Sequence, residues 1–397
     1  MGDRAYDVVL FGATGFTGTL TAEYLAAAVP PGIRWAIAGR SRAKLDTLRE
    51  RLSTFAAPAP EPAPAPAPAP DTIVADVDDP VALRELAGSA RVVATTVGPY
   101  VRYGEPLVAA CADAGTDYAD LTGEPEFVDL VYLRHHRTAE RTGARLVHAC
   151  GFDSIPHDLG AQYAVEQLPA DQPIRLRGYL RVRGAVSGGT LDSAVTAFSR
   201  ARRVTAVHRR RSTVEGRSTR ARAVTGRPGY DRDARTWVLP LPTIDPQIVV
   251  RSAAALDRYG PDFRYTHYAA FADPVRAAAV AAGAGSAVLL AQLPPARALL
   301  RRLRPAGTGP APGQRARNWF SVTFLGDTPG GDHVVARVSG GDPGYDETAK
   351  MLAESALSLA TDPLPETAGQ VTTAVALGHH LRDRLVAAGL RFEVVAP

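Results

Sequence analysis

A short apolar run followed by three regularly spaced glycines constrains the fold of this chain more than any other stretch. Residues 8–11 are short enough for a buried strand, the glycines stand at positions 12, 15 and 18, and an alanine-rich stretch follows as far as Ala28. We therefore predict a strand, a tight turn and a helix. In that arrangement, the glycines permit the turn, let backbone N–H groups approach a pyrophosphate and let the helix lie close on the sheet. The stretch predicts a dinucleotide-binding site, with an ordinary strand-to-helix turn as the alternative.

The end of the next expected strand indicates which dinucleotide binds. Residues 33–38 form a short apolar run that ends in Gly39, Arg40 and Ser41, where the residue that contacts the ribose should lie. An Asp or Glu at this place binds the 2′-hydroxyl group of NAD, whereas an arginine suits the 2′-phosphate of NADP. A guanidinium binds phosphate through two parallel hydrogen bonds, and the Ser41 hydroxyl adds a donor. The sequence favours NADPH; the alternative is that Arg40 is a solvated residue that opens a helix at 42–52.

Length and cysteine content set the broad class. With 397 residues, the chain is too long for one typical core, so we expect two domains. Two cysteines cannot build a disulfide framework, and no basic-then-apolar signal segment opens the chain, so we expect a cytoplasmic protein. The uncharged stretch at 277–293 contains Gln292, and we expect a buried or surface-lying helix there in place of a membrane span.

The net charge of +4 conceals one strongly basic segment. Nine arginines lie between Arg200 and Arg222 with a single acid, Glu215, which gives this segment +8 and leaves −4 for the rest of the chain. Such a patch indicates an acidic partner: an acyl carrier protein, the phosphates of a coenzyme A thioester, or peripheral contact with an anionic membrane. Nucleic acid is disfavoured because the segment has no aromatic side chains for stacking. A solvated arginine-rich loop without a partner is the alternative.

Alternating strands and helices predict an α/β fold. Residues 1–155 are expected to form a Rossmann domain, a doubly wound parallel sheet with helices on both faces. A second, α+β domain is expected over 156–345, and C-terminal helices at 346–397 are expected to pack back on the Rossmann domain. An alternating Pro-Ala segment at 56–70 should be an extended loop insertion, because proline fixes φ and lacks an amide donor.

The second domain should contain an antiparallel hairpin. Residues 319–325 and 333–338 alternate apolar and polar side chains around a turn rich in Gly, Asp and Pro. Helices are expected at 347–360 and 372–388, and a closing strand at 391–395. The open face of such a sheet could cap a cofactor crevice or form a homodimer.

Other strand ends should meet the glycine turn at one edge of the first sheet. Ligands of doubly wound sheets gather beyond the carboxyl ends of the strands. One strand, at 91–97, runs into Gly98, Pro99 and Tyr100, and another, at 145–149, runs into residues 150–156. The cofactor contacts that we predict are therefore Gly12, Ala13, Thr14, Gly15, Phe16, Thr17, Gly18, Arg40, Ser41, Asp76, Val97, Gly98, Pro99 and Phe152.

Taken together, these motifs resemble the saccharopine dehydrogenase-like oxidoreductases, and most of all the trans-acting enoyl reductases found beside polyketide synthases. The resemblance implies an NADPH-binding Rossmann domain with an α/β domain, and reduction of a carbon–carbon double bond in a polyketide or other acyl chain. The Pro-Ala insertion departs from the pattern. The run V-G-P-Y-x-x-Y-G is the most specific part of the matching segments, which are residues 12–18, 39–41, 96–104, 120–124, 151–160, 187–190, 339–345 and 351–360.

Reduction of an enoyl thioester needs a hydride at the β-carbon, a stabilised enolate oxygen and a proton for the α-carbon. We predict Tyr100 or His157 as the acid, with Asp153 orienting the nicotinamide or a water molecule. Plain alternatives are that Tyr100 stacks on the cofactor, that His157 caps a helix and that Asp153 caps a turn. No metal is expected, since the nine histidines show no ligand spacing with an acidic or thiol partner.

Two other functions stay open at this point. The first is reduction of a C=N bond, the imine chemistry of saccharopine reductases, which arginines lining the crevice would favour and an apolar tunnel would disfavour. The second is a non-catalytic NADPH-binding protein that docks on a carrier or lipid surface through its basic segment. The sequence does not name the substrate, the hydride face or the oligomeric state.

Overall fold

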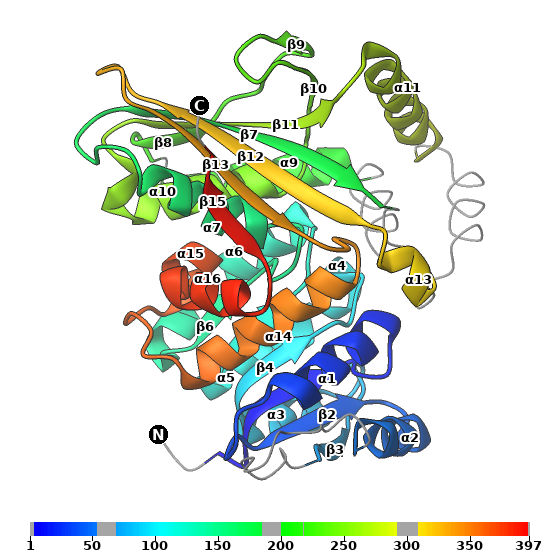
Figure 1. Cartoon of the computed structure of the whole chain (residues 1–397). Helices are drawn as coiled ribbons and strands as arrows, with labels where there is room; N and C mark the ends of the chain where they lie inside the picture. The colour runs from blue at the N-terminus through cyan, green and yellow to red at the C-terminus, as the bar shows by residue number, and fades with distance from the viewer. Residues whose placement is uncertain (1–3, 54–68, 185–199, 217, 292–308, 396–397) are drawn as a thin grey trace. The chain divides into compact units, whose positions relative to one another are not determined.

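The computed structural model describes residues 4–53, 69–184, 200–216, 218–291 and 309–395 (Figure 1). Most of the expected Pro-Ala loop at 56–70 and the segment at 187–190 lie outside these residues. The chain divides into two compact units, which we describe separately. Unit 1 comprises Met1–Thr122, Phe127–Gly151 and Tyr345–Val371, and unit 2 comprises Gly123–Glu126, Phe152–Gly344 and Thr372–Pro397.

A seven-stranded parallel sheet in the order β14-β6-β5-β4-β1-β2-β3 forms the centre of unit 1. Its central strands read as continuous apolar runs because both faces are covered; Val8, Val9 and Leu10 of β1 have no exposed surface. This sheet confirms the predicted Rossmann fold. The strands are β1 (Tyr6–Phe11), β2 (Trp35–Gly39), β3 (Asp71–Val74), β4 (Ala90–Thr95), β5 (Asp117–Asp120), β6 (Arg145–Val147) and β14 (Gly369–Val371).

Helices cover both faces of this sheet. Apolar side chains of α3, α5 and α6 share one core with β1, β2 and β4, while α1 and α14 pack against each other and against β1. Helix α14 is buried along almost its whole length, including Met351 and Leu357. The helices of unit 1 are α1 (Phe16–Ala28), α2 (Arg42–Ser53), α3 (Pro80–Ser89), α4 (Tyr100–Tyr103), α5 (Glu105–Ala114), α6 (Pro125–Thr142), whose first two residues belong to unit 2, and α14 (Asp346–Thr361).

A mixed sheet of eight strands forms unit 2. Seven strands follow the order β15-β13-β12-β7-β11-β10-β9, and β8 pairs in parallel with β11. The predicted hairpin is confirmed, since β12 and β13 pair antiparallel from Phe320 opposite Gly340 to Asp327 opposite His333. The strands are β7 (Ile174–Arg183), β8 (Ala221–Ala223), β9 (Gly229–Asp231), β10 (Thr236–Pro240), β11 (Phe263–Phe271), β12 (Trp319–Asp327), β13 (His333–Gly340) and β15 (Arg391–Val394).

One face of this sheet is buried under helices. Phe324 of β12 and Val338 of β13 have no exposed surface, and a Cβ atom on Gly160 of α7 would lie 2.5 Å from the Phe324 ring. Alternate residues of the same strands, such as Thr323 and Arg337, point to the opposite face, as the two-residue period of a strand requires. The helices are α7 (Ile155–Val165), α9 (Ala201–Glu215), α10 (Asp245–Ala255), η1 (Asp257–Tyr259), α11 (Pro274–Ala291), α13 (Pro312–Arg315), α15 (Thr373–Ala376) and α16 (Gly378–Ala387).

The end of the chain differs from the sequence-based expectation in two respects. Residues 346–397 were expected to pack back on the Rossmann domain as a whole, but residues from Thr372 onward belong to unit 2, because β15 extends its sheet beside β13. The helix expected at 372–388 is divided into α15 and α16 by a break at Leu377, and the φ of the following Gly378 is +47°. Helix α11 covers most of the uncharged stretch, and none of the described helices is long and apolar enough to cross a membrane.

Candidate cofactor and active site

The glycine turn joins β1 to α1 in unit 1. Gly12 has a φ of +85°, and a Cβ atom there would lie 2.6 Å from the Cγ2 atom of Val97. The Gly15 N–H group donates to the Gly12 carbonyl oxygen at 3.0 Å, which closes the turn. A Cβ atom on Gly18 would overlap that carbonyl oxygen. Backbone conformation and packing therefore require glycine at positions 12 and 18.

The start of α1 is suited to an anion. Gly15 occupies the N-cap position without a side-chain hydrogen bond, and the first helical turn contains no acidic residue. The unpaired N–H groups at a helix start and the positive end of its dipole attract negative charge. The amides of Gly12 and Ala13 are used elsewhere, since both donate to the Ala38 carbonyl oxygen, at 2.9 and 3.2 Å. The backbone donors that we expect to face a diphosphate are therefore those of Thr17 and Gly18, with Thr14 beside them.

Arg40 and Ser41 follow β2 directly, at the edge where the adenine ribose should lie. The Arg40 side chain is exposed and forms no ion pair with any residue that the structure describes. Arg42 behaves differently, because its guanidinium donates to the Thr72 hydroxyl at 2.9 Å. Asp76 follows β3 and its carboxylate accepts the Asp78 N–H group at 3.2 Å within a turn. Of the expected adenine-side contacts, Arg40 thus keeps its guanidinium available for a phosphate.

The segment after β4 lies beside the glycine turn. The Thr96 hydroxyl donates to the Gly12 carbonyl oxygen at 3.1 Å, and the Val97 side chain packs against Gly12. This contact brings Val97, Gly98 and Pro99 to the end of β1, where the strand ends of a doubly wound sheet bind their ligand. The Gly98–Pro99 peptide bond is cis.

Tyr100 links the ends of two strands. Its hydroxyl donates to the Thr95 carbonyl oxygen at 3.0 Å and accepts the Leu121 N–H group at 3.1 Å. Its ring is 6% exposed and packs at 5.7 Å, centroid to centroid, from the Phe127 ring. The hydroxyl is thus committed to holding the end of β4 against the segment that follows β5, a role that neither sequence-based alternative for Tyr100 anticipates.

Phe152 and Asp153 lie in unit 2, immediately before α7. The Phe152 ring packs edge-on against Phe320 at a centroid distance of 5.0 Å. Burial, and secondly the negative charge of Asp245, raise the pKa of Asp153 to about 7. Asp153 is only partly buried as a whole residue. Its carboxyl group is therefore largely protonated just below neutral pH, which is the state that a proton donor needs.

His157 lies in the first turn of α7 and is 1% exposed. Burial lowers its pKa to about 3, so its imidazole is neutral at physiological pH. Its Nε2 atom is directed toward Asp245, 3.4 Å from the Oδ1 atom. The helix-capping alternative from the sequence does not describe this geometry, because the side chain points to a neighbouring helix.

Comparison with known proteins identifies the family of this chain. Residues 8–148 match the family model of the saccharopine dehydrogenase NADP binding domain. A protein of Mycobacterium tuberculosis (strain H37Rv) named trans-acting enoyl reductase is 37% identical over 98% of this chain and 97% of its own length. A protein of the same name from Mycobacterium leprae is 36% identical with the same coverage. The chain belongs to the saccharopine dehydrogenase-like oxidoreductases.

The fold agrees with this family. The apo histidine-tagged saccharopine dehydrogenase (L-Glu forming) from Saccharomyces cerevisiae aligns with a TM-score of 0.57 over 98% of this chain and 100% of that chain. With 11% identity, this likeness concerns the fold alone. The family confirms the resemblance read from the motifs, the assignment as an NADP-dependent oxidoreductase, and NADPH as the cofactor.

The basic segment of this oxidoreductase is partly neutralised within unit 2, where five of its eight described arginines pair with carboxylates. Arg200 and Arg203 both bind the buried carboxylate of Glu126, at 2.6 and 2.8 Å. Arg211 pairs with Glu215 one helical turn away. Two others pair with aspartates, Arg220 with Asp257 and Arg222 with Asp262. Exposed arginines of α9 without an ion pair to a described residue are Arg202, Arg209 and Arg210.

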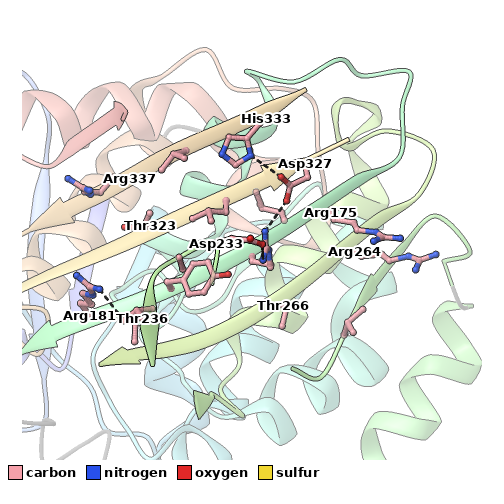
Figure 2. Close-up of a pocket in the computed structure, with 18 residues that line it drawn as sticks. Arg175, Arg181, Asp233, Thr236, Arg264, Thr266, Thr323, Asp327, His333 and Arg337 are labelled. Carbon is pink, nitrogen blue, oxygen red and sulfur yellow. Dashed lines mark hydrogen bonds and ion pairs between the residues drawn. The ribbon is translucent and has the colours of Figure 1, made fainter. Parts of the chain in front are cut away.

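A concave surface of about 1100 Å³ lies on the open face of the unit 2 sheet (Figure 2). Arg177, one of its lining residues, pairs with Asp233 at 2.7 Å and with Asp327 at 3.1 Å, and His333 also contacts Asp327, at 2.8 Å. Its positive charges are thus partly compensated, and no residue predicted from the sequence as a cofactor or catalytic contact lines it.

Two polar clusters escaped the sequence analysis. In unit 1, the buried Asp120 carboxylate accepts hydrogen bonds from the Tyr118 hydroxyl at 3.0 Å and the Ala149 N–H group at 3.0 Å, and lies 2.7 Å from His148 Nδ1. This network fixes the ends of β5 and β6. In unit 2, Asp245 and His267 both lie beside the buried His157 side chain. Their positions on separate elements leave no spacing signal in the sequence.

Proposed function

We propose that this oxidoreductase reduces the carbon–carbon double bond of an α,β-unsaturated acyl thioester carried by a synthase. The observation that carries the proposal is the identity of 36–38% over 98% of the chain to proteins named trans-acting enoyl reductase. Chains of such similarity and equal length commonly share reaction chemistry. The NADP-binding family model over residues 8–148 agrees with a hydride-transfer reaction.

The chain's own residues would hold the cofactor along the carboxyl edge of the unit 1 sheet. The first N–H groups of α1 would bind the diphosphate, and Arg40 with Ser41 would bind the 2′-phosphate. Val97, Gly98 and Pro99 would contact the nicotinamide half. Bound NADPH supplies the hydride that the β-carbon receives.

We assign the proton for the α-carbon to Asp153. Reduction adds one hydride and one proton across the double bond, so a group with a pKa near neutrality is the best donor. The pKa of Asp153, raised to about 7, meets this requirement. Tyr100 is less suitable because its hydroxyl already donates to the Thr95 carbonyl oxygen. His157 is less suitable because it is buried and directed at Asp245.

An assay with two substrate classes tests the reaction type. Purified protein with NADPH is given 2-enoyl pantetheine thioesters of several chain lengths and, separately, imines formed from an amino acid and a 2-oxo acid. We expect NADPH oxidation and a saturated thioester of two additional mass units only with the enoyl substrates. Turnover of the imines alone would contradict the proposal, and so would tight NADPH binding without turnover of either class.

We also propose an acidic acyl carrier protein as the partner that presents the substrate, docking at Arg202, Arg209 and Arg210. Charge complementarity at a docking surface mainly raises the association rate. Reversing the three charges to glutamate should therefore raise KM for a carrier-bound enoyl substrate and leave KM for the pantetheine thioester unchanged. Arg84→Glu, on the exposed side of α3, is the control. Equal KM values for the triple variant and the control would contradict this partner site. A homodimer stays a prediction.

A further inference from the structure

Three buried polar side chains from three separate elements meet inside unit 2. His157 comes from α7, Asp245 opens α10, and His267 lies on β11; their exposed fractions are 1%, 3% and 4%. One nitrogen or oxygen atom of each lies within 4.8 Å of those of the other two. The two imidazole rings cross at 87° with centroids 4.6 Å apart. Side chains of this polarity are buried together only when something compensates them.

Hydrogen bonds within the cluster do not provide that compensation. His157 Nε2 lies 3.4 Å from Asp245 Oδ1, and His267 Nε2 lies 3.8 Å from Asp245 Oδ2. Both separations exceed the 2.7–3.2 Å range of N–H···O hydrogen bonds. Asp245 Oδ1 and His267 Nε2 are buried and have no hydrogen-bond partner among the described residues. His157 Nδ1 is likewise buried without a hydrogen-bond partner among the described residues. Each of the three side chains thus leaves one buried polar atom unsatisfied.

The surroundings of His267 orient its Nε2 atom toward Asp245. The hydroxyl of Tyr265, two residues before His267 on the same face of β11, lies 3.0 Å from His267 Nδ1. If Nδ1 carries the proton and donates it to that oxygen, Nε2 presents a lone pair to Asp245. Histidines that bind metals usually hold their second ring nitrogen in this way. The Asp245 carboxylate is itself fixed by a hydrogen bond from the Thr243 side chain.

We propose that His157, Asp245 and His267 bind a divalent transition-metal ion of the zinc class, which ties α7 and α10 to the unit 2 sheet. Ligands at 2.0–2.1 Å in a tetrahedral site stand roughly 3.3 Å apart. The 3.4 Å between His157 Nε2 and Asp245 Oδ1 is close to this value, and one donor atom from each of the three residues lies within 4.8 Å of the other two. Two neutral imidazoles and one carboxylate form a common set for Zn²⁺ and for its spectroscopic substitute Co²⁺.

We assign this ion a stabilising role, with water in the fourth coordination position, as in other zinc sites that have three protein ligands. Its three ligands are buried, and they derive from two helices and the strand beneath them, so that binding would stabilise the folded unit. The pKa of Asp153 is raised mainly by burial and secondly by the charge of Asp245. A bound cation would offset the second cause and leave the first. No metal was expected from the sequence because its histidines show no ligand spacing with an acidic or thiol partner; the three ligands lie far apart in the chain.

Titration of the full-length protein with Co²⁺ tests the site. After treatment with a chelator and its removal, we expect one equivalent of Co²⁺ to produce the intense visible absorption bands of four-coordinate cobalt, and Zn²⁺ to displace it. We also expect stoichiometric Zn²⁺ to raise the Tm. Absence of these bands together with absence of Zn²⁺ binding by calorimetry would overturn the proposal, as would bands typical of six-coordinate cobalt.

Variants locate the ion. His267→Gln and Asp245→Asn should each lose the Co²⁺ bands and the Zn²⁺-dependent rise in Tm. His333→Gln is the matched control, since His333 also lies on a unit 2 strand beside an aspartate but on the exposed face. Bands that persist in both ligand variants, or disappear in the control alone, would overturn the assignment. NADPH binding and circular dichroism monitor folding; if both ligand variants unfold, the titration of the unsubstituted protein decides.

Discussion

The glycine turn of unit 1 and the polar cluster of unit 2 are built in opposite ways. The turn is one continuous stretch from Gly12 to Gly18, and its function depends on backbone N–H groups that glycine leaves accessible. The cluster instead gathers side chains from α7, α10 and β11, with Asp153 just before α7. A site built from backbone groups leaves a pattern in the sequence, whereas a site of converging side chains becomes visible only once the fold is known.

The largest effect should come from the unit 2 side of this comparison. Replacing the proposed donor, Asp153→Asn, should lower kcat for enoyl reduction by about 10²–10⁴-fold, the usual contribution of a positioned acid. The NADPH Kd should be unchanged, because the groups proposed to bind the phosphates and the nicotinamide half, namely the start of α1, Arg40, Ser41 and residues 97–99, lie in unit 1. Tyr100→Phe is the comparison variant, expected to lower kcat less than tenfold. Steady-state kinetics and fluorescence titration measure the two quantities. Equal kcat values for Asp153→Asn and the unsubstituted enzyme would remove Asp153 from the mechanism.

On the unit 1 side, Gly12→Ala should weaken both the fold and NADPH binding. The methyl group adds left-handed strain at a φ of +85° and an overlap with Val97 at 2.6 Å. We expect the free energy of unfolding to fall by about 2–4 kcal/mol. Gly32→Ala is a matched control, because Gly32 has a φ of +88° but open space around it, so only strain of about 1 kcal/mol applies. Urea denaturation of both variants checks this; equal losses would show that packing at Gly12 contributes nothing.

Coenzyme choice should depend on one guanidinium. Arg40→Ala should raise the Kd for NADPH by about 10- to 100-fold, the equivalent of losing charge-assisted hydrogen bonds, and leave the Kd for NADH unchanged. Arg42→Ala, which removes a guanidinium bound to Thr72, should leave the preference intact. Calorimetric titration with both coenzymes measures the difference. If Arg40→Ala weakens both coenzymes equally, the 2′-phosphate is bound elsewhere.

The smallest effect should be the dependence of kcat on pH; we expect kcat to fall on the alkaline side only. Asp153 donates a proton only while protonated, and its pKa is raised to about 7. Therefore kcat should be constant below that pH and fall as the pH rises through it, by about tenfold per unit well above the pKa. A profile that instead rises through neutrality would mean that the ionised carboxylate is the active form.

Much of unit 1 could be predicted because its signals are local. Residues 8–18 and the arginine after β2 each lie within one contiguous element, and the family confirms the fold and the cofactor that they indicated. Strand β14 was not foreseen, because Gly369, Gln370 and Val371 are too few to form a pattern and become a strand only beside β6. The break at Leu377, before a Gly378 with positive φ, was likewise not foreseen in a stretch whose neighbours favour helix.

The catalytic predictions depended on contacts that a sequence cannot display. The Tyr100 hydroxyl bonds to Thr95 and Leu121, 21 positions further along the chain. His157 faces Asp245, on a helix that follows much later. Desolvation, which raises the pKa of Asp153 and lowers that of His157, arises only from the packed structure. Tyr100, His157 and Asp153 as catalytic residues stay predictions; the raised pKa of Asp153 and the existing contacts of the other two side chains favour Asp153.

One labelling measurement tests the central claim that hydride and proton add across a carbon–carbon double bond. A 2-enoyl pantetheine thioester is reduced with NADPH deuterated at C4 in ordinary water, and again with unlabelled NADPH in D₂O, and each product is analysed by NMR. If the C4 label lies on the face from which the hydride is transferred, we expect deuterium at the β-carbon of the first product. In the second product we expect deuterium from the solvent at the α-carbon. Recovery of unreduced thioester in both reactions, or solvent deuterium at the β-carbon, would contradict this claim.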